Sequence, residues 1–381
     1  MLKSFLNNKP LYYDKIDYTR MPRVYESVRR KIKLPKIIHI IGTNGKGTTG
    51  RFLATALHSL GKRVGHYTSP HILNFNERIW IDGEDISDTL LDRSHLELLK
   101  ILSKEDADSL SYFEYTTLLA IYIYQDMEYV VLEAGLGGER DATAVFAKYL
   151  TLVTPIDIDH EAFLGSDISS IALTKLNAIE NVAIMAQQKY SDVKTVAQKL
   201  VTEKKIQVLE LETLISSSDD LKIKDITLEN ALAPYLQNNL TLAIAALNYM
   251  KLSYEVKDFK NSRLFGRLTQ IKENVILDVG HNVLAARSIY ESLKDSKYTL
   301  VYNSYKDKNY KEILEILKPM LSDIEIIKID DERVEDIDVL ASFVKEIGFD
   351  FKIFSEVDDK KNYLVFGSFS VAEEFLRIGD E

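Results

Sequence analysis

Short apolar segments alternate with helical patterns of apolar residues along most of the chain. Leu53, Leu57 and Leu60 recur at helical spacing, and Gly61 follows them as a typical helix-ending residue. Further helices are expected at 168–179 and 239–250. Strands are expected at 36–41, 63–68, 129–133, 151–156, 182–185, 275–279, 299–302 and 363–366. Regular alternation of this kind is typical of α/β proteins built on parallel sheets.

A polar stretch at 257–263 interrupts this alternation, and a second strand–loop–helix unit begins near Val275. We therefore expect two α/β domains, with a larger one at 1–262 and a smaller, Rossmann-like one at 263–381. The chain has 381 residues, of which 46% are hydrophobic, and this is enough to fill two cores.

Composition narrows the classes of function. A net charge of −10 argues against nucleic acid as the main partner, because binding a phosphate backbone needs a basic face. The absence of cysteine excludes a disulfide framework, a thiol nucleophile and cysteine-ligated metals. No apolar run reaches the ~18–20 residues of a membrane span, and polar residues interrupt 1–15. A soluble, cytoplasmic protein without a membrane partner is expected.

The clearest chemical motif is the glycine-rich segment that follows the apolar strand 36–41. Its sequence reads Gly-Thr-Asn-Gly-Lys-Gly-Thr over 42–48, a variant of the phosphate-binding loop in which Gly47 separates the lysine from the hydroxyl. Backbone N–H groups at such a turn can surround phosphates, Lys46 can neutralise them, and Thr48 can reach Mg²⁺. The alternative is a glycine-rich connection without a ligand. The motif predicts a P-loop-containing, parallel-sheet ATPase domain.

Other polar residues stand where predicted strands end, which is where open α/β sheets bind ligands. Glu133 ends a buried strand just before three glycines, and a buried carboxylate is costly unless it is paired or binds a cation. Ser69 offers a hydroxyl for a metal, although Ser-Pro is also a common turn. His160 follows Asp157 and Asp159 at another strand end and is either a ligand or a core histidine.

Three further positions carry weaker signals. Lys175 lies in the helical pattern 168–179, where a lone lysine is most often solvated. In the second domain, Arg267 could close over phosphates and Asp278 could accept from ribose hydroxyls. A linker arginine and a turn aspartate are the alternatives.

Taken together, the motifs resemble the folylpolyglutamate synthase/dihydrofolate synthase family of the Mur ligase superfamily. The Ser-Pro-His turn followed by Asn-Glu-Arg favours folate ligases over the cell-wall members. The resemblance extends over nearly the whole chain and is carried, in order, by 42–48, 67–71, 76–79, 112–115, 133–138, 141–143, 159–160, 265–267, 278–282, 306–308 and 366–368.

The resemblance implies an ATP-dependent amide ligase. It would join L-glutamate to dihydropteroate, to tetrahydrofolate or to both through an acyl phosphate. The segment 1–262 would be an ATP-binding Mur-ligase-like central domain, and 263–381 a Rossmann-like glutamate-ligase domain. The expected cofactors are ATP and two Mg²⁺ ions, and the family members are usually monomers.

Roles for individual residues follow from the same resemblance. Ser69 and Glu133 match ligands of one Mg²⁺, His160 matches a ligand of the second, and Lys175 matches a lysine that the family carbamylates. The expected catalytic residues are Lys46, Glu133, His160 and Lys175. The nucleotide site would consist of Thr43, Asn44, Gly45, Lys46, Gly47, Thr48, Asn239, Arg267 and Asp278. The pterin would be held by Tyr112, Phe113, Glu114, Tyr115, Arg140, Asp141 and Ala142.

The chain departs from the family pattern in three places. The usual Gly-Gly-Arg-Leu-Asp-Ala-Thr-Asn becomes Gly-Gly-Glu-Arg-Asp-Ala-Thr-Ala at 137–144, the usual Glu-Lys-Ala-Gly becomes Thr-Lys-Leu-Asn at 174–177, and Tyr235 stands where histidine is common. Two other functions fit the motifs: a ligase for a UDP-linked cell-wall precursor, and a non-catalytic ATP-binding switch. The sequence does not distinguish the first glutamate addition from extension of the tail, and it does not give the tail length.

Overall fold

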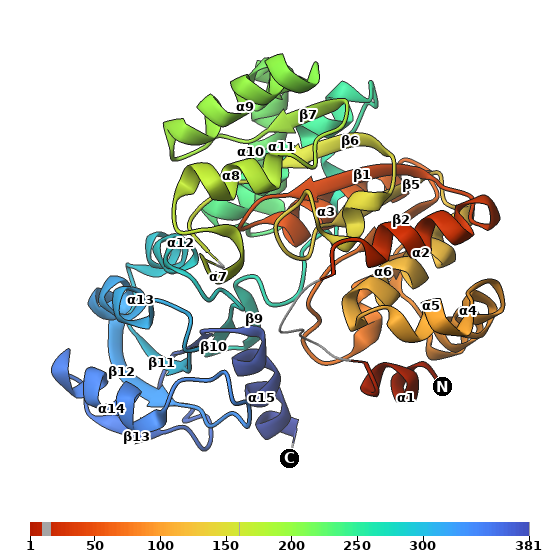
Figure 1. Ribbon diagram of the computed structural model, residues 1–381. Coiled ribbons are helices and arrows are strands. Elements are labelled where there is room, and N and C mark those ends of the chain that lie inside the picture. Colours follow the sequence, from red (N-terminus) through yellow and green to blue (C-terminus); the bar gives the residue numbers. More distant parts are fainter. Residues whose placement is uncertain (10–16, 160, 381) are drawn as a thin grey trace. The chain divides into compact units, whose positions relative to one another are not determined.

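The computed structural model describes residues 1–9, 17–159 and 161–380 (Figure 1). By the density of contacts the chain divides into two compact units. The first comprises 1–231 and 236–262, and the second comprises 232–235 and 263–381. The expected fold class, a phosphate-loop α/β domain followed by a smaller α/β domain, is confirmed.

The first unit is built on an eight-stranded sheet with the order β4-β3-β2-β5-β1-β6-β7-β8. All neighbouring pairs are parallel except β2 with β3 and β3 with β4. The strands are β1 Lys36–Ile41, β2 Val64–Tyr67, β3 Ile79–Ile81, β4 Glu84–Asp85, β5 Tyr129–Glu133, β6 Lys148–Val153, β7 Val182–Met185 and β8 Gln207–Glu210.

Helices cover both faces of this sheet (Figure 1). His66 and Tyr67 point to opposite faces of β2; His66 lies beside Gly50 of α3, whereas Tyr67 packs into the core formed with α6. The helices are α1 Leu2–Asn7, α2 Arg20–Val28, α3 Lys46–Ser59, α4 Asp88–Ile101, α5 Lys104–Ser109, α6 Tyr112–Ile123, α7 Glu161–Leu164, α8 Ile168–Leu176, α9 Ser191–Lys204, α10 Ser217–Glu229 and α11 Pro234–Tyr249.

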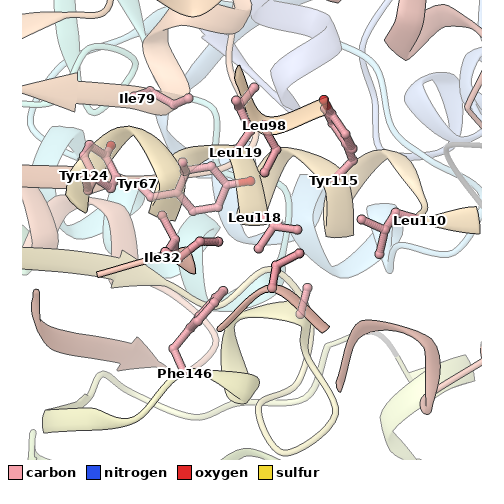
Figure 2. Close-up of a cluster of buried hydrophobic side chains, with 14 of the residues drawn as sticks. Ile32, Tyr67, Ile79, Leu98, Leu110, Tyr115, Leu118, Leu119, Tyr124 and Phe146 are labelled. Carbon is pink, nitrogen blue, oxygen red and sulfur yellow. The ribbon is translucent and has the colours of Figure 1, made fainter. Parts of the chain in front are cut away.

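The core on the α6 side of the sheet is rich in aromatic and branched residues (Figure 2). Tyr115, Leu118 and Leu119 of α6 are fully buried there, together with Tyr67 of β2 and Phe146. Two more features fix the start of α6: Ser111 caps it, and Glu114 returns a hydrogen bond to the Ser111 backbone. The first turn of α6 is therefore held both by its cap and by its packing.

The second unit contains a six-stranded sheet with the order β13-β12-β11-β14-β10-β9, in which only β9 is antiparallel to its neighbour. Its strands are β9 Thr269–Lys272, β10 Val275–Leu277, β11 Tyr298–Tyr302, β12 Leu321–Ile326, β13 Phe351–Ile353 and β14 Tyr363–Phe366. Its helices are α12 Val283–Leu293, α13 Tyr310–Leu317, α14 Ile337–Glu346 and α15 Phe369–Asp380.

Each expected strand is present, but one is displaced. The strand expected at 151–156 is β6, and it runs from Lys148 to Val153. The chain leaves the sheet after Val153 because the Pro155 carbonyl accepts a hydrogen bond from the Thr43 backbone N–H. The strand therefore ends where the chain begins to support the glycine-rich loop.

Candidate active site

The glycine-rich loop connects the buried strand β1 to α3 and has backbone angles that require glycine. Gly42 and Gly45 have φ angles of 139° and 86°. A Cβ on Gly42 would lie 2.0 Å from Thr154 Oγ1, and a Cβ on Gly45 would lie 2.3 Å from Asn239 Oδ1. Because Gly45 occupies the N-cap of α3, no side chain at that position competes for the first N–H groups of the helix. The local geometry favours an anion at this helix end.

Two side chains of α3 bring the expected phosphate chemistry to this loop. Lys46 Nζ donates to the carbonyl oxygens of Gly42 and Thr43 at 3.4 and 3.1 Å. The Thr48 hydroxyl is buried, and the described residues provide no hydrogen-bond partner for it. A buried hydroxyl without a partner is costly, and an oxygen of a phosphate or a hydrated cation would satisfy it.

Glu133 lies at the end of β5 beside the end of β1, since it is in register with Ile40. Its carboxylate is 5% exposed and accepts hydrogen bonds from the Thr68 hydroxyl and, at 3.2 Å, from the Ser69 backbone N–H. The structure thus brings together the two side chains predicted to bind one Mg²⁺, from β5 and from the segment after β2.

Among residues 1–9, 17–159 and 161–380, no cluster of three or more histidine or carboxylate side chains could hold a metal. This donor set still fits Mg²⁺, which commonly binds one or two carboxylates and completes its shell with phosphate and water oxygens. Glu133 supplies the carboxylate, and Ser69 and Thr48 supply hydroxyls. His160, predicted as the ligand of a second ion, lies outside the described residues.

Lys175 is buried in α8 and reaches the glycine-rich loop, so it does not follow the common solvated reading of a helix lysine. Its side chain amine donates to the Gly42 carbonyl at 2.9 Å. Burial, and secondarily the nearby charge of Lys46, lowers the pKa of Lys175 from 10.5 to about 7. A large fraction of this amine is therefore neutral near pH 7.

A cavity of about 380 Å³ lies in the same unit, between α2 and the loop 139–145. This volume is within the range of small-molecule sites. Four of the seven residues predicted to hold the pterin line it: Glu114, Arg140, Asp141 and Ala142. Its opposite wall, which the sequence did not predict, includes Tyr18, Met21 and Tyr25.

Segment 137–144, where the sequence differs from the usual family motif, contains three polar residues whose contacts the structure shows. The Arg140 guanidinium lies 4.8 Å from the centre of the Tyr18 ring, a cation–π contact. Glu139 accepts a hydrogen bond from Asn177 at 3.2 Å. Asp141 is buried and accepts from Leu136 N, Thr143 N and Thr143 Oγ1, so it belongs to the loop structure and does not form an ion pair with Arg140.

The other predicted pterin residues lie in the first turn of α6. Tyr112 and Phe113 are half-buried, with the Arg78 guanidinium 5.4 Å from the Tyr112 ring centre and Gly135 against the Phe113 ring. Tyr115 is fully buried and bonds His95 Nδ1 through its hydroxyl at 2.7 Å. It supports the site from within the core (Figure 2) and does not line the cavity.

Replacing Glu114 with alanine should reduce stability substantially. The Glu114 carboxylate accepts 2.7 Å hydrogen bonds from Arg20 Nε and from the Ser111 backbone N–H. The substitution would take a charged acceptor away from the buried Arg20 guanidinium and from the Ser111 N–H, and should lower the free energy of unfolding by about 3–5 kcal/mol. Urea denaturation measures this, with the exposed Glu105→Ala as control. Equal midpoints for the two variants would contradict a structural role for Glu114.

The remaining predicted nucleotide residues fall in different units. Asn239 of α11 belongs to the first unit and lies against Gly45. Asp278 belongs to the second unit, where it is buried and accepts hydrogen bonds from Tyr235, Leu268 and Gly280. Arg267, in the same unit, bonds the Gly266 carbonyl and lies 5.4 Å from the centre of the Phe369 ring. The part of Arg267 and Asp278 in nucleotide binding stays a prediction.

A parallel sheet with a glycine-rich loop, an attached lysine and a carboxylate on the neighbouring strand defines a phosphate-loop nucleotide-binding protein. Comparison with known proteins narrows this class. The chain belongs to the dihydrofolate synthase/folylpolyglutamate synthase family, as the resemblance of its motifs implied. It is 33% identical over 310 residues to the dihydrofolate synthase/folylpolyglutamate synthase of Escherichia coli K12, covering 76% of this chain and 72% of that protein.

Solved structures agree with this assignment. The Helicobacter pylori folylpolyglutamate synthetase is 35% identical, with a TM-score of 0.82 and coverage of 100% of this chain and 98% of that one. A bifunctional folylpolyglutamate synthase/dihydrofolate synthase solved with Mn, AMPPNP and L-glutamate is 25% identical, with a TM-score of 0.80 and coverage of 99% and 97%. No protein-family model matches the chain. Among the described residues, no helix is long and apolar enough to cross a membrane.

Proposed function

We propose that this protein is an ATP-dependent amide ligase that joins L-glutamate to a pteroate-type carboxylate in folate metabolism. The family membership supports the reaction. The observation that supports assigning it to these residues is that Lys175 connects the phosphate loop to Gly138, the residue that precedes the cavity loop. Gly138 packs directly against the Lys175 backbone, and Lys175 Nζ bonds Gly42. The cavity would hold the pterin, and the phosphate loop would hold ATP.

The reaction needs two transfers. The substrate carboxylate is a poor electrophile, so it first attacks the γ-phosphorus of ATP; the bond from γ-phosphorus to the bridging oxygen breaks, and ADP leaves. The product is an acyl phosphate. The α-amine of glutamate then attacks the acyl carbon, inorganic phosphate leaves, and the amine loses a proton. Each transfer develops charge on phosphoryl oxygens, which the N–H groups at the start of α3 and the Lys46 ammonium would stabilise.

Divalent metal is the second requirement of the proposal. We assign Glu133, Ser69 and Thr48 as the groups that would hold a Mg²⁺ ion beside the phosphates. The ion, when bound, would neutralise phosphoryl oxygens as a Lewis acid. A second ion, with His160 as ligand, is the finer part of the proposal.

The buried amine of Lys175 suits the modification that the family resemblance implies. With a pKa near 7, the amine offers a neutral nitrogen lone pair at physiological pH. Attack on carbon dioxide would form an N–C bond and release a proton, giving a carbamate with a negative charge. The negative carbamate on Lys175 would attract the Lys46 ammonium, whereas a protonated Lys175 would repel it.

Release of ADP, assayed separately with dihydropteroate and with tetrahydrofolate, each with glutamate and Mg²⁺, tests the function. We expect turnover that requires glutamate and at least one of the two folate substrates, and that stops when EDTA removes the metal. Turnover with a UDP-linked cell-wall precursor instead would identify the other type of ligase. Binding of ATP without turnover under every condition would indicate a nucleotide switch and would overturn the proposal.

A further inference from the structure

A buried histidine on the central strand of the first unit bonds a residue of the cavity loop. His39 of β1 is fully buried between two apolar neighbours in sequence, Ile38 and Ile40. Its Nε2 lies 2.8 Å from Thr143 Oγ1, in the short 3₁₀ segment Ala142–Val145 of the cavity loop. Its Nδ1 is buried and has no hydrogen-bond partner among the described residues.

The hydrogen bonds around Asp141 fix the direction of this contact. Asp141 Oδ1 accepts from Thr143 N at 2.9 Å and from Thr143 Oγ1 at 2.5 Å, and its Oδ2 accepts from Leu136 N at 2.8 Å. An ionised carboxylate can only accept, so the Thr143 hydroxyl gives its proton to Asp141. The Thr143 oxygen must then accept from His39, which is the neutral tautomer with its proton on Nε2.

Electrostatics supports the same protonation state. Burial, with a smaller contribution from the charge of Lys148, lowers the pKa of His39 to about 3. The Lys148 ammonium is itself engaged, with the Glu180 carboxylate at 2.5 Å and with the Ala144 carbonyl. His39 therefore stays neutral throughout the physiological range and acts as a hydrogen-bond donor, not as an acid–base group.

This position is an unfavourable one for histidine if only stability is considered. An apolar side chain on the buried strand would avoid the desolvation of two ring nitrogens, one of which gains no partner. Among the described residues, the one hydrogen bond that the histidine ring makes is the bond to Thr143. That bond holds the Thr143 hydroxyl toward Asp141, which is one of the residues that line the cavity.

We infer that His39 is a positioning residue, which acts through Thr143 to fix the Asp141 carboxylate in the orientation that binds the pterin-bearing substrate. The inference rests on the proposed function, because it takes the cavity as the pterin site. Without the donor at Nε2, the buried Thr143 oxygen accepts from no group among the described residues, and only its bond to Asp141 holds the hydroxyl in place. The Thr143 hydroxyl, and with it one of the hydrogen bonds to the Asp141 carboxylate, is then less firmly fixed.

Two polar substitutions of His39, whose side chains differ in length, test the inference. In His39→Gln the amide nitrogen stands near the place of Nε2, whereas in His39→Asn it stands near the place of Nδ1. The Gln variant should keep KM for the pteroate substrate within about twofold of the wild type, and the Asn variant should raise it about tenfold, the effect of losing one good hydrogen bond. KM for ATP and kcat should change little in both.

His39→Leu removes both nitrogens and adds a stability readout. We expect it to unfold at the same urea concentration as the wild type or a higher one, while its KM for the pteroate substrate rises at least as much as in His39→Asn. Loss of stability together with an unchanged KM would show that His39 serves the core alone, and would overturn the inference. So would equal KM values for the Gln and Asn variants.

The failure of this inference is distinguishable from failure of the proposed function. A wild-type protein that releases no ADP with any folate substrate contradicts the function itself. A wild-type protein that is active, with His39 variants that leave KM unchanged, contradicts only the positioning role. Long-range ¹H–¹⁵N spectra of the histidine rings provide an assay-independent check, since we expect the proton of His39 on Nε2 and the opposite tautomer would exclude the bond direction derived above.

Discussion

Replacing Lys46 with alanine is expected to abolish glutamate-dependent release of ADP while leaving the fold intact. In the free protein the amine contacts only carbonyl oxygens of its own loop among the described residues, and it is partly exposed. Its removal should therefore change the free energy of unfolding by less than about 1 kcal/mol. During turnover, the same charge faces phosphoryl oxygens that gain negative charge. Its loss should reduce kcat by about 10³-fold or more.

Steady-state release of ADP and a urea unfolding curve for the same preparation measure the two effects. Lys100→Ala is a suitable control, because Lys100 is an exposed lysine on α4 paired with Glu97. Near-normal turnover of Lys46→Ala would remove the phosphate loop from the mechanism and would contradict the ligase assignment. A large loss of stability would instead show that Lys46 has a structural role.

Replacing Lys175 with methionine is expected to change how stability depends on pH. The folded pKa of Lys175, about 7, lies below the ordinary value of 10.5. Between these values the unfolded chain binds the proton and the folded protein does not, so stability rises with pH by up to about 1.4 kcal/mol per pH unit. Below pH 7 the full penalty of the buried charge is present, as much as about 5 kcal/mol. The methionine variant lacks this dependence.

The measurement is the difference between the urea unfolding free energies of the variant and the wild type, from pH 6 to pH 10, without nucleotide, metal or carbon dioxide. The variant's advantage should be greatest at pH 6 and should shrink steadily above pH 7. Parallel curves would show that Lys175 is not desolvated. The variant is also the control for carbamylation, since ¹³C-labelled bicarbonate should give a carbamate resonance in the wild type alone.

The phosphate loop and Glu133 could be predicted because their signals are local. A buried strand, a turn rich in glycine and a lysine follow one another within about a dozen residues, and each has one physical explanation. Glu133 stands out because an acidic residue directly follows four residues that belong in a core. The structure places Glu133 beside β1 as the parallel sheet requires.

The cavity could be predicted only on one side. Its loop carries a recognisable motif, but Tyr18 lies just before α2 and Tyr25 lies within it. Both come more than 110 residues earlier than the Arg140 they accompany, and no local pattern marks them. Tyr115 shows the opposite difficulty. An aromatic run at the start of a helix has the same pattern whether its rings face a ligand or the core, and only the packing of α6 separates Tyr112 from Tyr115.

The prediction of strand positions was wrong where tertiary contacts override the apolar pattern. Lys148 is the first residue of β6, although a lysine is not expected in a buried strand. Its buried amine is paired with the Glu180 carboxylate. The strands that were not predicted, β3, β4, β8, β9, β12 and β13, lie toward the edges of the two sheets, where polar residues weaken the alternation. His39 was read only as part of a strand; a histidine within an apolar run is the signal that could have drawn attention to it.

The close approach of Asn239 to Gly45 has a consequence for biosynthesis. The loop that would hold the phosphates is encoded near the start of the chain, but one of its supporting side chains is made nearly two hundred residues later. A nascent chain that ends before α11 lacks this support, however well its early strands have paired. The glycine-rich loop therefore gains this support only when translation of the first unit is almost finished.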